Sequence, residues 1–124
     1  MSKKFGLIVA CLLAGATPAL AQNATCTEPN PPTMVDGNTV AQAQLVATIA
    51  QVKDFIAKSD VYQQCIADDL EAKKKAAASA STPMDPGLQQ VALAKVAANQ
   101  AAKDKLAKDI NDQIVLFKKK AAAK

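Results

Sequence analysis

The chain has 124 residues, half of them apolar, and carries 15 basic against 11 acidic side chains with no histidine and no tryptophan. That length suits one small domain. Without histidine the chain lacks the usual general base of nucleophilic catalysis and the commonest metal ligand, so we expect no enzyme, no cofactor and no metal site.

Residues 1–21 have the pattern of a secretory signal peptide. Lys3 and Lys4 precede an apolar run over residues 5–16, and Ala19-Leu20-Ala21 supplies the small residues of a cleavage site. We expect cleavage between Ala21 and Gln22, which leaves 103 residues in the periplasm or outside the cell.

The same segment could instead be an uncleaved membrane anchor or a lipoprotein signal. An uncleaved membrane anchor needs about 20 apolar residues, and the run is shorter. Lipoprotein processing at Cys11 is suggested by Ile8-Val9-Ala10-Cys11, which fits a lipobox. Because the apolar run continues past Cys11, ordinary cleavage is the favoured reading.

Residues 22–38 form an extended, proline-rich leader. Pro29, Pro31 and Pro32 fix their own backbone angles and push the residues before them toward β or polyproline II geometry. Asp36-Gly37 indicates a turn. We expect Asn38 or Thr39 to cap the helix that follows.

A long amphipathic helix is predicted over residues 40–78. Its apolar stripe weakens at Ser59 and Asp60, where Asp60 and Gln63 resemble a capping box that could interrupt the helix. We favour an unbroken helix in which Ser59 and Asp60 face water. The apolar positions fall mostly three or four residues apart: Leu45, Ile49, Val52, Ile56, Ile66 and Leu70, with Phe55 and Tyr62 beside them.

A second helix is predicted over residues 86–118. Thr82-Pro83 ends the first helix, and Asp85 caps the second with Pro86 at its first position. Two helices of similar length and a short loop predict an all-α fold, an antiparallel hairpin, with a frayed basic tail at 119–124. The clean apolar stripe of the second helix comprises Leu106, Ile110, Ile114 and Phe117.

The two halves of the cleaved chain have opposite charge. Residues 22–72 carry two lysines against seven acidic residues, a net charge of −5. Residues 73–124 carry eleven lysines against four acidic residues, a net charge of +7. Halves of opposite charge attract each other, which favours the antiparallel hairpin over a uniformly basic binder.

The cleaved chain has two cysteines, Cys26 and Cys65, and an even count in an exported protein indicates a disulfide. An intermolecular bridge or free thiols are the alternatives. An internal bridge requires a chain reversal at Asp36-Gly37 and a leader that runs almost taut along the first helix. Met34 and Val35 would then be the leader's apolar contacts.

The charged clusters favour solvated helix faces over binding sites. Asp68, Asp69 and Glu71 are near neighbours along one helix and point in different directions, whereas a calcium site needs six to eight converging oxygens. In the second helix, Asp104, Asp109 and Asp112 alternate with Lys103, Lys105 and Lys108, a pattern typical of a solvated helix face. The chain lacks arginine and has few aromatic residues, so base readout is not expected and attraction to anionic polymers or membrane surfaces would be weak.

The order Cys26, Pro31-Pro32, Asp36-Gly37 and then Tyr62-Gln63-Gln64-Cys65 resembles small exported bacterial helical proteins of unknown function. Those proteins share such a leader and a Tyr-x-x-Cys helix. The resemblance covers residues 26–70. It implies export and a disulfide, and it implies no activity.

We therefore expect a non-enzymatic secreted or periplasmic protein with a structural or protein-interaction role. Another protein or a second copy would pack on apolar surface that two helices leave uncovered, with Phe55 and Tyr62 as anchors. The alternative is weak electrostatic binding of anionic polymers or membrane surfaces through the second helix and Lys118, Lys119 and Lys120. No small-molecule ligand is inferred.

Overall fold

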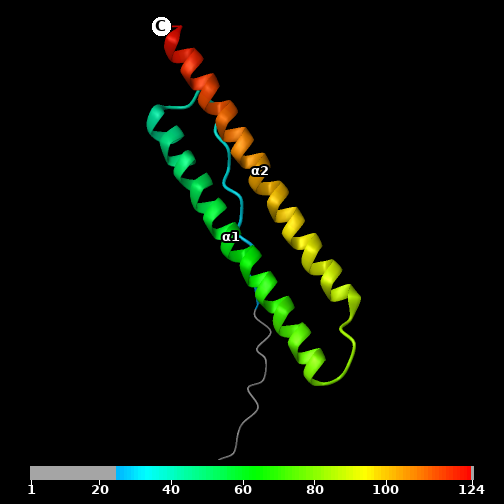
Figure 1. The fold of residues 1–124 in the computed structure, drawn as a ribbon. Coiled ribbons are helices and arrows are strands. Elements are labelled where there is room, and N and C mark those ends of the chain that lie inside the picture. Colours follow the sequence, from blue (N-terminus) through cyan, green and yellow to red (C-terminus); the bar gives the residue numbers. More distant parts are fainter. Residues whose placement is uncertain (1–24, 124) are drawn as a thin grey trace, which may run out of the picture.

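The computed structural model describes residues 25–123, and its architecture is an antiparallel helical hairpin with a third, extended layer (Figure 1). Helix α1 spans Gln42–Ser79 and helix α2 spans Pro86–Ala122. The leader, residues 25–36, runs along the hairpin with no regular secondary structure. The expected signal peptide, its cleavage after Ala21 and the lipobox at Cys11 lie outside the described residues.

Helix α1 is continuous, as predicted, and buries one seam along most of its length. The expectation that Ser59 faces water is wrong, because its side chain is 0% exposed. A small hydroxyl fits this seam at low cost when it is hydrogen-bonded. Ile49, Ile56 and Leu70 of the predicted stripe are half-buried. The buried positions alternate in steps of three and four: Leu45, Thr48, Val52, Phe55, Ser59, Tyr62 and Ile66.

The turn before α1 differs from the expected cap. Ala41 is the N-cap and makes no side-chain hydrogen bond, so the assignment of Asn38 or Thr39 as the cap is wrong. The reason is that both residues belong to the turn that precedes the helix. The backbone amides of Thr39 and Val40 donate to the Asp36 carbonyl at 3.1 and 2.9 Å, and the Asn38 amide donates to Asp36 Oδ1 at 2.9 Å.

The start of α2 is as predicted. Asp85 Oδ1 accepts a hydrogen bond of 2.8 Å from the Gly87 amide, and Pro86 occupies the first turn. The end of α2 is four residues later than expected, since the helix continues to Ala122 and absorbs most of the expected tail at 119–124. Alanine and lysine favour helix, and Lys119 and Lys120 complement the negative end of its dipole.

The predicted disulfide joins Cys26 of the leader to Cys65 of α1, with the two Cα atoms 5.7 Å apart. Chain reversal at residues 37–39 directs the leader back along α1, as the bridge requires (Figure 1). The expected contacts Met34 and Val35 pack against the core. That core consists of Val40, Leu45, Val52, Phe55, Leu106 and Ile110, with half-buried Ile49, Ile56, Ala102, Ile114 and Phe117 around it.

Candidate interaction surface

A buried polar layer fixes how the two helices lie against each other. Asn99 is 1% exposed, and its Nδ2 donates to Ser59 Oγ at 3.2 Å. The same Asn99 accepts, through Oδ1, a hydrogen bond of 2.9 Å from Gln63 Nε2. A buried asparagine that needs one partner across an interface favours a single register. These hydrogen bonds fix which residues of α1 and α2 lie opposite each other, both toward the loop and toward the open end of the hairpin.

An ion pair across the hairpin reinforces the same register. Lys103 of α2 contacts the carboxylate of Asp60 of α1, and the lysine side chain is only 14% exposed. The sequence pattern placed Lys103 on a solvated face, and this assignment is wrong. Neighbouring Lys105 and Lys108 fit that description, because each pairs with an aspartate one turn later and is 75% exposed.

The two aromatic residues expected to anchor a partner are core residues. Phe55 is 3% exposed and Tyr62 is 5% exposed, so neither offers surface to another molecule in this structure. Tyr62 lines a hollow with leader residues Thr27 and Pro29. Burial raises the pKa of the Tyr62 phenol, and the negative charge of Glu28 in the leader raises that pKa further. The leader thus covers the position where a partner was expected.

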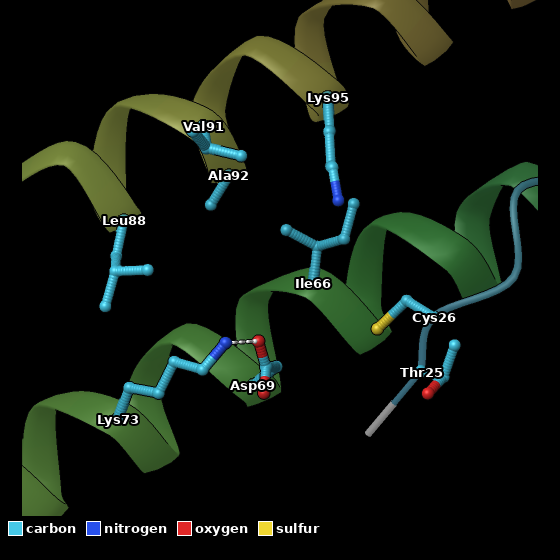
Figure 2. Close-up of a pocket in the computed structure, with 9 residues that line it drawn as sticks. All are labelled: Thr25, Cys26, Ile66, Asp69, Lys73, Leu88, Val91, Ala92 and Lys95. Atoms are coloured by element: carbon cyan, nitrogen blue, oxygen red, sulfur yellow. Dashed lines mark hydrogen bonds and ion pairs between the residues drawn. The ribbon is translucent and has the colours of Figure 1, made fainter. Parts of the chain in front are cut away.

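Apolar surface that no other described residue covers lies instead toward the loop end of the hairpin. Among the described residues, the leader starts beside Ile66, and a groove of about 230 Å³ continues from there between α1 and α2 (Figure 2). Leu88 and Val91 are 41% and 55% exposed. We name this groove the loop-end groove; its lining comprises Thr25, Cys26, Ile66, Asp69, Lys73, Leu88, Val91, Ala92 and Lys95.

Charges border the loop-end groove on both helices. Lys73 Nζ lies 2.6 Å from Asp69 Oδ2, which neutralises the α1 side locally. On α2, Lys95 is exposed and points toward the groove (Figure 2). None of the ion pairs between described residues includes Lys95. The groove therefore combines an apolar floor with a cation, Lys95, that has no acidic partner among residues 25–123.

The groove was not identified from the sequence. Leu88, Val91 and Ala92 lie in an alanine-rich stretch whose apolar pattern is weak. The available signal was the spacing of Leu88, Val91 and Lys95, which fall at steps of three and four on one helix face. What the sequence pattern could not supply was where the described part of the leader, from Thr25 on, meets the hairpin.

The lysines at the end of α2 do not form a common patch. Lys118 and Lys119 are exposed and Lys120 is half-buried. Consecutive helical residues project about 100° apart, so these three side chains face different directions. They can attract anions generally, without converging on one ligand.

The acidic cluster of α1 is engaged in local contacts. Asp68 accepts a hydrogen bond of 2.8 Å from Gln64 Nε2, while Asp69 pairs with Lys73. Within residues 25–123, no group of three or more His, Cys, Asp or Glu side chains is placed to hold a metal ion. In the same residues, neither helix has the length and apolar character of a membrane span.

No protein-family model, curated protein or solved structure matches this chain.

Proposed function

We propose that this protein is exported and acts without catalysis, by packing an amphipathic segment of another protein into the loop-end groove. The observation that carries the proposal is the continuity of that groove with the interface between leader and hairpin. The leader already lies on the same side of the helices up to Cys26, beside Ile66. A partner segment would extend this third layer over Leu88 and Val91.

The chemistry of the groove defines the partner segment. Leu88 and Val91 favour aliphatic or aromatic side chains, because their burial removes apolar surface from water. Lys95 favours a carboxylate at the edge of the segment. The expected partner is therefore a protein segment with apolar residues on one side and an acidic residue next to them. A second copy of this chain is an alternative occupant.

Export is supported by the disulfide, because such bridges persist in oxidising compartments. The intact mass of the exported protein tests this part. We expect a chain that begins at Gln22 and takes up a thiol reagent only after reduction. A lipid-modified chain that begins at Cys11 would contradict it.

A photo-crosslinking residue at Val91 tests the partner proposal in the producing cell. We expect one adduct, and peptide mapping should place it on an apolar segment with a neighbouring carboxylate. Leu88→Asp should abolish the adduct, because the partner's apolar side chains would then have to desolvate a carboxylate on the groove floor. The matched control is the same crosslinker at Leu93, which is 58% exposed and does not line the groove.

Two results would contradict the partner proposal. Equal adducts from positions 91 and 93 would show that contact is not specific to the groove. An adduct that maps onto this chain itself, with a dimer in sedimentation, would make a second copy the occupant. The salt dependence of binding distinguishes the alternative function from this one. Electrostatic binding of anions through Lys118 and Lys119 should fall steeply as ionic strength rises.

A further inference from the structure

We propose that the Cys26–Cys65 bridge is a site of thiol–disulfide exchange, whose reduction by a dithiol releases the leader while the hairpin stays folded. The proposal rests on how the leader is attached and on the surroundings of the bridge. It is independent of the partner proposed for the loop-end groove.

The leader is attached to the helices at its two ends. At one end the Gly37 amide donates a hydrogen bond of 2.8 Å to Gln113 Oε1 of α2. At the other end stands the disulfide to Cys65. None of the hydrogen bonds or ion pairs between described residues involves residues 27–35. This segment is held by packing, of Met34 and Val35 against the core near the Gly37 end and of Pro29 and Pro32 beside Phe55.

The residues that form the bridge are partly exposed. Cys26 and Cys65 are both half-buried rather than enclosed. They line a largely apolar hollow of about 380 Å³ whose rim includes Val61, 71% exposed. Cys26 also lies at the end of the loop-end groove, where Figure 2 shows its side chain directed toward α1. Solvent therefore approaches both cysteines from the hollow, and Cys26 also from the loop-end groove.

The exchange needs a dithiol as the electron donor. One thiolate of the dithiol attacks a sulfur of the bridge, and the other bridge sulfur leaves as a thiolate. The second thiolate of the dithiol then attacks the dithiol sulfur of the mixed disulfide, and the remaining protein cysteine leaves as a thiolate. The products are the Cys26 and Cys65 thiols and an oxidised dithiol, so two electrons and two protons move to the protein.

The hairpin has its own interface and does not depend on the leader for its register. Ser59 and Asn99 are hydrogen-bonded across it and Asp60 pairs with Lys103, and none of these residues belongs to the leader. Release of the leader uncovers Phe55, which shares a hollow with Pro29 and Pro32 of the leader, and Tyr62 beside Thr27. Reduction would thus convert two core aromatic residues into exposed apolar surface.

Tyr62 reports this change directly, because it is the only tyrosine and the chain has no tryptophan. The exported protein is treated with dithiothreitol without denaturant, and thiol alkylation is followed by mass. We expect complete reduction, a severalfold rise in acrylamide quenching of Tyr62 fluorescence, and an unchanged helical circular-dichroism signal. The double variant Cys26→Ser/Cys65→Ser should show the same high quenching with or without dithiothreitol.

Three results would each overturn the proposal. The bridge could resist dithiothreitol until denaturant is added, which would show that it is inaccessible. Tyr62 could stay protected after reduction, which would show that packing alone holds the leader. Helical signal could be lost on reduction, which would make the bridge a requirement of the fold. The single variant Cys65→Ser also lacks the bridge but keeps the Cys26 side chain. High quenching of Tyr62 in this variant would therefore come from release of the leader and not from a change at Cys26.

Discussion

Asn99 and Ser59 are hydrogen-bonded across the helix interface at 3.2 Å, and both side chains are withdrawn from solvent, at 1% and 0% exposure. A buried amide is costly without partners, so this pair resists any sliding of α1 against α2. A slide would also separate Asp60 from Lys103. The alanine-rich half of α2 has few large side chains to fix its position, and the polar layer does so instead.

Ser59→Ala should lower the free energy of unfolding by about 1–3 kcal/mol, because it leaves the buried Nδ2 group of Asn99 without the Ser59 acceptor. The double variant Ser59→Ala/Asn99→Leu should recover most of that loss, since both buried polar groups are then gone and Gln63 keeps Gln100 as an acceptor. Chemical denaturation measures both. Ser79→Ala, at an exposed position of α1, is the control and should change stability by less than about 0.5 kcal/mol.

Gly37→Ala should lower stability by about 1–3 kcal/mol through overpacking. A methyl group there would stand 2.1 Å from the backbone oxygen of Gln113 and 3.0 Å from Leu116 Cβ. Backbone cannot move aside as a side chain can. Gly87→Ala is the matched control, because its nearest contact is an Asp85 carboxylate oxygen at 3.2 Å. Equal losses in thermal unfolding would contradict a close approach at Gly37.

Ser81→Gly should raise stability by about 0.5–1 kcal/mol. Ser81 follows the α1 C-cap with φ of 52°, a left-handed conformation that glycine adopts without penalty. The Thr82 amide donates to the Ala77 carbonyl and the Ser81 amide to that of Ala78, the bonds of a Schellman motif. Ala72→Gly, at an exposed position inside α1, should do the opposite by about the same amount. Calorimetric melting temperatures distinguish the two.

The Tyr62 phenol should titrate above the ordinary tyrosine pKa of about 10, because burial and Glu28 both disfavour its anion. A pKa raised by folding means that the folded state holds the proton more tightly. The resulting stabilisation is complete below about pH 10 and is lost as pH rises through the folded-state pKa. Ultraviolet absorbance of the tyrosinate follows the titration.

Glu28→Gln isolates the leader's part in that titration. The variant should lower the pKa of Tyr62 without returning it to the ordinary value, because burial is the larger cause. Glu71→Gln removes an acid that does not act on Tyr62 and is the control. A Tyr62 pKa that is the same in Glu28→Gln as in the unmodified protein would mean that the leader does not bring Glu28 near the phenol.

The sequence by itself determined the elements and most of their limits. Apolar spacing defined both helices, Asp85-Pro86 set the start of α2, and the pair Cys26 and Cys65 implied the bridge. The helix and cap signals depend on residues close together in the sequence. The disulfide could be inferred from the reach of the leader and from an oxidising compartment. For the same reason the hairpin and the taut leader could be predicted without knowledge of any contact.

Only the tertiary structure decided which side chains are covered. Ser59 became a core residue because Asn99, 40 positions away, supplies its partner. Phe55 and Tyr62 are buried beside the leader. Leu88 and Val91 are exposed near the point where the described leader begins. Burial depends on which segments meet in space, and residue spacing within one helix carries no information on that. The candidate surface therefore followed from the fold.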